Sequence, residues 1–170
     1  MKIRNIAALN RENGFTFVEL IVILVIISIV TFSIAINFND SNSGIKCEFV
    51  IKKIAADVRY ARQMALAKGT GTRVYIDTSN NQYYLKWSNG TYIQNPETGA
   101  DFIIQLGNGS FQSIEITGTE FLNGRLDFST QGNPSNSGLN FSGELNLVTL
   151  NSKKALRVVA NTGFLKIADI

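Results

Sequence analysis

Gly14-Phe15-Thr16-Phe17-Val18-Glu19-Leu20, followed at once by the apolar run Ile21-Val22-Ile23-Leu24-Val25-Ile26-Ile27, decides how this chain is organised. A short, mostly cationic leader ends at Gly14. The aromatic Phe15 then opens a long apolar stretch. One acid, Glu19, lies five residues after the glycine and inside that stretch. Each feature is common alone, whereas their combination is specific.

Residues 15–36 are predicted to form a transmembrane helix, because this range contains a single charge, Glu19. As a helix it would be about 33 Å long, which matches a hydrocarbon core of about 30 Å. Three cations precede the stretch (Lys2, Arg4 and Arg11), and the first charge after it is Asp40. The positive-inside tendency therefore predicts a cytoplasmic N-terminus and export of everything after residue 36.

An ordinary secretory signal fits this pattern badly. Such a signal has an apolar region of about 7–15 residues and a small-residue cleavage site at its far end, whereas here Gly14 precedes the run. The segment resembles the N-terminal processing signal of type IV pilins and of type II secretion pseudopilins. The resemblance implies cleavage between Gly14 and Phe15 by a membrane-bound prepilin peptidase, which also methylates the new amine of Phe15.

Glu19 needs a physical explanation, because an ionised acid inside a membrane is costly. Processing would place the new amine of Phe15 about one helical turn away. The resemblance implies that Glu19 pairs with this amine on a neighbouring subunit and so sets the axial register of a filament. The alternative is an interfacial glutamate on a plain anchor helix, whose carboxylate reaches the lipid headgroups.

The exported part begins after a polar stretch, Asn37 to Gly44, that is rich in helix-breaking residue types. From residue 45 the apolar residues recur at steps of 4 and 3, which predicts an amphipathic helix to Lys68 that ends at Gly69. Its stripe contains Cys47, Ile51, Ile54, Val58, Ala61 and Ala65, and Cys47 is predicted to be a small core residue. The expected organisation is leader 1–14, transmembrane helix 15–36, polar hinge 37–44 and exported domain 45–170, with helix 45–68 and a β-rich part 70–170.

After residue 70 the sequence predicts nine short strands separated by glycine and asparagine turns. They are 73–76, 82–87, 102–106, 111–116, 126–129, 139–141, 145–150, 155–160 and 164–167, and the last two form a hairpin around Asn161-Thr162-Gly163. Residues 132–138 have the composition of the most flexible loop. The expected fold class is α+β, with a long N-terminal helix on a C-terminal β-sandwich or bent antiparallel sheet.

The exported part is also similar to the GspH/FimT group of minor pseudopilins and minor type IV pilins. The similarity lies in Ile54–Ala65 with the Arg73–Ile76 strand, in Leu126–Pro134, and in the closing Leu156–Val159 and Gly163–Ile167. It implies a pilin-like fold and a structural subunit of a type II secretion pseudopilus or type IV pilus, in the bacterial inner membrane with its C-terminal domain in the periplasm. The implied partners are prepilin peptidase, other pilins or pseudopilins and an inner-membrane assembly platform.

Composition excludes several kinds of chemistry. The chain of 170 residues has no histidine and one cysteine, so a zinc or copper cluster, a Ser-His or Cys-His nucleophile and an intramolecular disulfide are all ruled out. The formal charge is +3, but the leader carries three cations and one acid, which leaves 13 basic and 12 acidic side chains. No enzyme activity, cofactor or small-molecule substrate is predicted.

Three groups of residues leave a binding function open. Arg59 and Arg62 share a helix face, where they could pair with acids of another subunit or remain solvated. Aromatic residues gather near one hairpin beside Lys86 (Tyr83, Tyr84, Trp87 and Tyr92), where they could stack on bases or on each other. Lys153, Lys154 and Arg157 form a short basic group. The alternative function is a DNA-binding minor pilin for transformation, but the ending Phe164–Ile170 has one base and one acid and lacks that branch's basic C-terminal motif.

Overall fold

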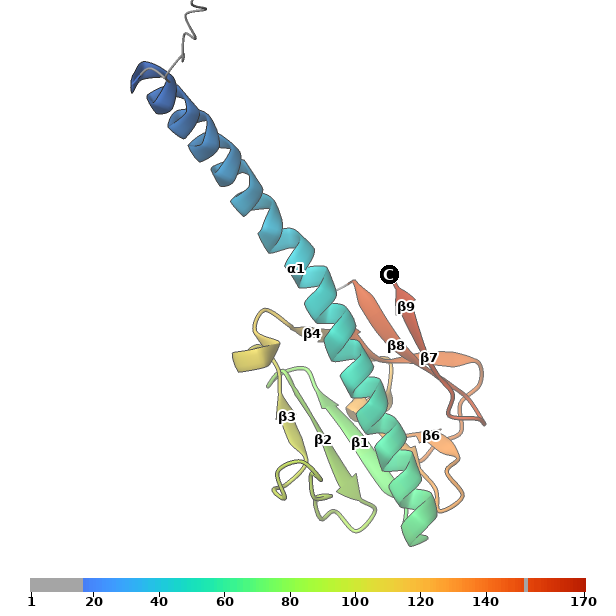
Figure 1. Cartoon of the computed structure of the whole chain (residues 1–170). Helices are drawn as coiled ribbons and strands as arrows, with labels where there is room; N and C mark the ends of the chain where they lie inside the picture. Colours follow the sequence, from blue (N-terminus) through green and yellow to red (C-terminus); the bar gives the residue numbers. More distant parts are fainter. Residues whose placement is uncertain (1–16, 152) are drawn as a thin grey trace, which may run out of the picture. The chain divides into compact units, whose positions relative to one another are not determined.

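The computed structural model describes residues 17–151 and 153–170, in two compact units that meet between Asp40 and Ser41. Helix α1 (Phe17–Lys68) contributes to both units (Figure 1). The second unit continues with nine strands and two 3₁₀ turns. These are β1 (Thr72–Asp77), β2 (Gln82–Trp87), β3 (Ile103–Gln105), η1 (Gly109–Phe111), β4 (Ile116–Gly118), η2 (Leu122–Gly124), β5 (Arg125–Phe128), β6 (Pro134–Asn136), β7 (Glu144–Leu150), β8 (Lys154–Val159) and β9 (Leu165–Asp169).

The part of α1 in the second unit buries the predicted apolar stripe. Its six members, from Cys47 to Ala65, are each at most 1% exposed, so the predicted stripe and the core position of Cys47 are confirmed. The helix ends at Lys68, and Gly69 follows with φ +60°, a left-handed conformation that terminates helices. The Thr72 hydroxyl then donates to Ala61 O at 2.9 Å, which ties the start of β1 to the helix.

The strands form two antiparallel sheets, one with the order β3-β2-β1-β5-β6 and one with the order β4-β7-β8-β9. In Figure 1, β1, β2 and β3 lie on one side of the C-terminal part of α1, and β7, β8 and β9 lie on the other. Buried residues of both sheets and of α1 make one apolar cluster. The predicted α+β class, a helix packed on antiparallel β structure, is therefore confirmed. Of the two predicted arrangements, a β-sandwich or one bent sheet, the structure has two separate sheets.

Most predicted strands are present, and the turn Asn161-Thr162-Gly163 joins the antiparallel pair β8–β9 as expected. Two predicted strands, 139–141 and 111–116, are wrong. Residues 139–141 are not a strand, whereas the loop predicted at 132–138 contains the edge strand β6, which pairs with β5. Pro134 opens this strand, a position where the missing N–H costs no ladder hydrogen bond.

The predicted strand at 111–116 is also wrong, because most of this segment is irregular and β4 begins only at Ile116. Side chains of two turn asparagines replace a neighbouring strand there. Asn81 Nδ2 donates to Ile114 O at 2.9 Å, and Asn81 Oδ1 accepts from Ile116 N at 2.8 Å. Asn151 likewise holds Glu115 N and Ser113 O, at 2.7 and 3.0 Å.

Residues 37–44, the predicted hinge, fall within α1. The backbone there is helical, and a hinge function for these residues stays a prediction.

A buried polar contact lies between α1 and β2. The Tyr83 hydroxyl donates to Asp57 Oδ2, and Lys53 Nζ lies 3.4 Å from the same oxygen. Burial raises the pKa of Asp57, although the bond from Tyr83 and the charge of Lys53 oppose that rise. Burial and the adjacent Asp57 also raise the pKa of Tyr83, so its hydroxyl stays a donor.

We expect Asp57→Ala to lower the free energy of unfolding by about 1–3 kcal/mol, because the buried Tyr83 hydroxyl loses its acceptor. Asp57→Asn keeps an acceptor and removes the buried charge, so it should cost less. Because the folded pKa of Asp57 is raised, the wild type gains stability as pH falls through that pKa toward the ordinary value of 3.8. Asp57→Asn should reduce this gain, which denaturant unfolding at a series of pH values would measure. An unchanged pH profile would contradict the assignment.

Candidate assembly site

The predicted processing residues, Gly14 and Phe15, lie outside the described residues. Glu19 is described and lies in the first turn of α1, where a carboxylate interacts favourably with the helix dipole. Its side chain is exposed within the single chain.

The first unit of α1 exposes large apolar side chains all around the helix. From Phe17 to Ile29, eleven of them are between 41% and 78% exposed. The Ser28 hydroxyl donates to Leu24 O at 2.7 Å, so this polar group is satisfied inside the helix. A helix that is apolar on every side is normally buried by lipid or by other helices. Glu19 would then be desolvated together with its neighbours.

Across residues 17–151 and 153–170, no helix carries an apolar stretch of the length and composition that a bilayer crossing requires.

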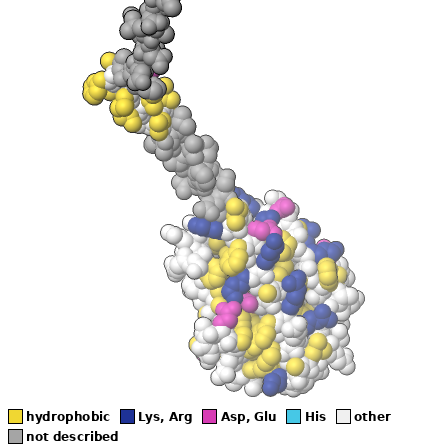
Figure 2. Space-filling model, in the orientation of Figure 1, with side chains coloured by type: hydrophobic (Ala, Val, Ile, Leu, Met, Phe, Trp, Pro, Cys, Tyr) yellow, Lys and Arg dark blue, Asp and Glu magenta, His cyan; other side chains and the backbone are white. Residues whose placement is uncertain are grey.

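The face of the second unit that α1 crosses carries both cations and acids (Figure 2), and two of its lysines are paired on the helix, Lys52 with Glu48 and Lys53 with Asp57. Figure 2 shows Lys and Arg side chains spread over this face, with apolar side chains between them.

The two arginines predicted to share a face behave differently: Arg59 is exposed, whereas Arg62 Nε donates to Gly132 O at 2.9 Å. Arg62 therefore stabilises the turn after β5, and Arg59 is the member of the pair that is open to solvent.

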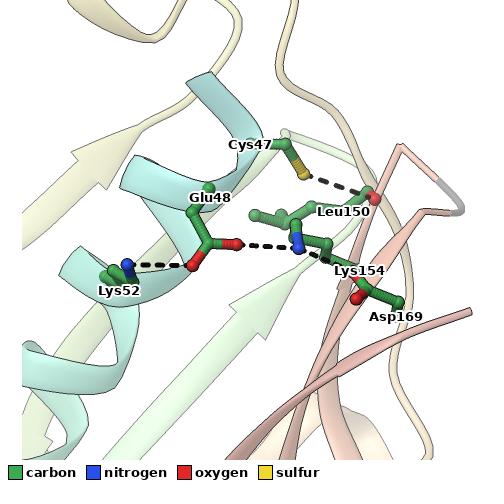
Figure 3. Close-up of polar contacts among 6 residues, drawn as sticks. All are labelled: Cys47, Glu48, Lys52, Leu150, Lys154 and Asp169. Atoms are coloured by element: carbon green, nitrogen blue, oxygen red, sulfur yellow. Dashed lines mark hydrogen bonds and ion pairs between the residues drawn. The ribbon is translucent and has the colours of Figure 1, made fainter. Parts of the chain in front are cut away.

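The predicted basic group near the C-terminus is largely paired within the chain. Lys154 Nζ lies 2.7 Å from Glu48 on α1 and 2.6 Å from Asp169 on β9 (Figure 3). The hydrogen bonds to Asp169 and Glu48 raise the pKa of Lys154, and the bond from Lys154 is the main cause that lowers the pKa of Glu48. Arg157 Nε donates to Asn146 Oδ1 at 3.0 Å. Lys154 therefore connects α1 to the second sheet, and Arg157 connects β7 and β8 within that sheet.

Cys47 lies beside this network, one residue before Glu48. Its thiol faces Leu150 O at 3.8 Å, and burial raises its pKa. A protonated thiol in the core is a poor nucleophile, and this one donates a weak hydrogen bond to Leu150 O. No group of three or more metal-ligating side chains occurs within the described ranges.

The aromatic residues predicted near one hairpin do not form a single surface patch. Tyr83 points into the core, while Tyr84 lies on the opposite face of β2 with Lys86. A member that the sequence analysis missed, Tyr75 on β1, stacks on Tyr84 with ring centroids 4.9 Å apart. The strand register Tyr75↔Tyr84 is the signal that would have found it. The DNA-binding alternative is not supported, since these rings stack on one another and the central C-terminal cation, Lys154, is paired with Glu48 and Asp169.

Comparison with known families gives two matches. Residues 9–35 match the prokaryotic N-terminal methylation motif. Residues 51–163 match the type II transport protein GspH. No curated protein sequence matches this chain.

Among solved structures, the fold is similar to the minor pseudopilin EpsH from the type 2 secretion system of Vibrio cholerae. The sequence identity is 11% and the TM-score 0.44, over 73% of this chain and 97% of that one.

Proposed function

Since this chain belongs to the GspH family of type II transport proteins, we propose that it is a minor pseudopilin or minor pilin, a structural subunit with no catalytic role. After processing it joins or caps a type II secretion pseudopilus or a type IV pilus. There it supports protein secretion or pilus biogenesis.

The observation that carries this proposal is the apolar surface of the first unit together with its one acid. Eleven large apolar side chains between Phe17 and Ile29 are exposed, and Glu19 lies among them. Such a surface is stable when lipid covers it and equally when the helices of other subunits cover it. The same helix can therefore serve as a membrane anchor before assembly and as a filament core afterwards.

The proposed location follows from the same segment. Residues 15–36 anchor the chain once in the cytoplasmic membrane, the leader 1–14 lies in the cytoplasm, and residues 45–170 lie in the periplasm. Prepilin peptidase, other pilins or pseudopilins and an assembly platform in the inner membrane are the proposed partners. Energy for assembly would come from a separate protein, because the chain has no nucleotide-binding motif.

The processing step is tested by the intact mass and N-terminal sequence of the protein recovered from membranes. We expect the wild type to begin at Phe15 and to carry one added methyl group, and Gly14→Val to keep residues 1–14, because the cleavage site is blocked. Gly44→Val is the matched control, because a Cβ at Gly44 meets no atom within 4 Å. A wild-type chain that begins at Met1 in cells with active prepilin peptidase would overturn the proposal.

A further inference from the structure

The face of the five-stranded sheet that points away from the core carries aromatic and cationic side chains in a regular array. Strand alternation places Val74 and Leu85 in the core and Tyr75, Tyr84 and Lys86 on the outer side. The register pairs Tyr75 with Tyr84 and Arg73 with Lys86. We call Arg73, Tyr75, Tyr84, Lys86 and Tyr92 the tyrosine–cation face.

Lys86 is held at the centre of this face by three rings. Its Nζ lies 4.2 Å from the ring centroid of Tyr92, 5.2 Å from that of Tyr84 and 5.9 Å from that of Tyr75. These distances are within cation–π range. Lys86 has no carboxylate within ion-pair distance among the described residues. The ammonium group is therefore positioned by the rings, while its charge is not neutralised.

The neighbouring charges leave the face with an excess of positive charge. Arg73 lies directly opposite Lys86 in the antiparallel pair, an arrangement that is unfavourable for like charges. The nearest acid in the same row is Asp127, which is 3.9 Å from Arg73 and 2.9 Å from Arg125. Asp127 is therefore shared by Arg73 and Arg125 and contacts Arg125 more closely. A second acid on this side of β1, Asp77, accepts from Asn80 and Gln82. The three cations Arg73, Lys86 and Arg125 thus face two carboxylates, neither of which contacts Lys86.

The geometry of the rings indicates which partner this face suits. Tyr75 and Tyr84 are stacked at an interplanar angle of 14°, and Tyr92 meets Tyr84 edge-on at 60°. The rings contact one another and Lys86, so a base or sugar that stacked on them would compete with these contacts. Burial raises the pKa of Tyr84, which keeps its hydroxyl protonated at neutral pH. The groups that stay available to a partner are N–H and O–H donors.

We propose that the tyrosine–cation face binds an acidic segment of a neighbouring exported subunit, with a partner carboxylate seated on Lys86 and Arg73. Tyrosine and arginine are enriched at the energetic centres of protein interfaces, and a fixed excess of positive charge selects an acidic partner. Ile103, 41% exposed and paired with Tyr84 across β2–β3, adds an apolar contact at the edge. This inference rests on the proposed function, because it takes the partner from the same filament.

The test uses the full-length chain in cells that contain its secretion or pilus machinery. A photo-crosslinking amino acid replaces Ile103, next to the face but outside the Lys86 contacts. We expect crosslinking to a peptide of another exported subunit that contains Asp or Glu. Lys86→Glu should reduce the crosslinked fraction at least fivefold, and Asp or Glu→Lys in the crosslinked peptide should restore it.

A carboxylate at position 86 would relieve the like-charge pair with Arg73 but lose the contacts with three rings. A thermal unfolding midpoint of Lys86→Glu equal to that of the wild type would separate a lost contact from misfolding. Lys153→Glu is the charge-matched control, at an exposed position between β7 and β8 of the other sheet, and a probe at Leu139, 62% exposed, is the positional control. Crosslinks that persist in Lys86→Glu, or that join nucleic acid, glycan or lipid, would overturn the proposal. The absence of any crosslink in cells where the chain begins at Phe15 and is assembled would also overturn this inference, while the proposed function would still hold. A chain that is not processed overturns both.

Discussion

Replacing Gly124 by alanine should destabilise the second unit more than replacing any other glycine for which the surrounding space is known. Gly124 ends η2 with φ +61°, and an added Cβ would lie 2.2 Å from Ile76 O on β1. The left-handed backbone costs a side chain about 1–2 kcal/mol, and overpacking typically adds about 1–3 kcal/mol. We expect a loss of about 3 kcal/mol or more, which thermal unfolding in detergent would show as a lower midpoint.

Gly69→Ala separates the two contributions to that loss. Gly69 has nearly the same φ, +60°, but an added Cβ would meet no atom within 4 Å. It should therefore cost only the backbone strain of about 1–2 kcal/mol. Equal losses of unfolding free energy for the two variants would contradict this prediction. They would show that β1 moves to make room for the new methyl group at position 124, so the close contact of η2 with β1 adds no cost of its own.

The sequence predicts those parts of the fold that depend on local periodicity. The stripe of helix 45–68 and the pair β1–β2 repeat at 3.6 and 2 residues, so their buried residues could be named in advance. The irregular backbone of residues 111–116 could not be predicted from periodicity, because its hydrogen bonds come from Asn81 and Asn151, which are distant in sequence. The edge strand β6 is missed for a similar reason: Pro134 and its neighbours have loop composition, and only pairing with β5 makes them a strand.

The candidate sites also differ in whether local sequence or long-range pairing forms them. Glu19 can be predicted as a site residue because the motif around it is a contiguous stretch of sequence, and its role in assembly stays a prediction. The tyrosine–cation face depends on the register between β1 and β2 and on the bridge Lys86↔Tyr92. Composition near the hairpin suggests one aromatic group, whereas strand alternation sends Tyr83 inward to Asp57 and Tyr84 outward to Lys86. Lys154 is the opposite case. The sequence suggests a cation that is available for binding, but in the fold this residue of β8 is paired with Glu48 on α1 and Asp169 on β9.

Glu19→Gln should abolish most incorporation into filaments while leaving processing intact. The change keeps the size of the side chain but removes the charge that would pair with the amine of Phe15. Once apolar side chains such as Phe17 and Leu20 are covered, that amine would be left in a low-dielectric environment. Breaking a buried ion pair by removing one partner costs about 3–5 kcal/mol, and about 1.4 kcal/mol corresponds to a tenfold change. We therefore expect the assembled fraction, measured in sheared filaments, to fall at least about tenfold.

The comparison that decides the role of Glu19 is between this loss and the N-terminus of the same variant. A chain that begins at methylated Phe15 but stays in the membrane fraction would place the defect after processing, where the ion pair acts. Glu97→Gln is the control, because it removes an exposed acid from the second unit. If Glu19→Gln assembles as well as the wild type, the carboxylate is an interfacial group that reaches the headgroups. The axial stagger between subunits would then have to come from packing of the apolar side chains of α1. Such packing offers many equivalent registers, whereas one buried charge permits a single register.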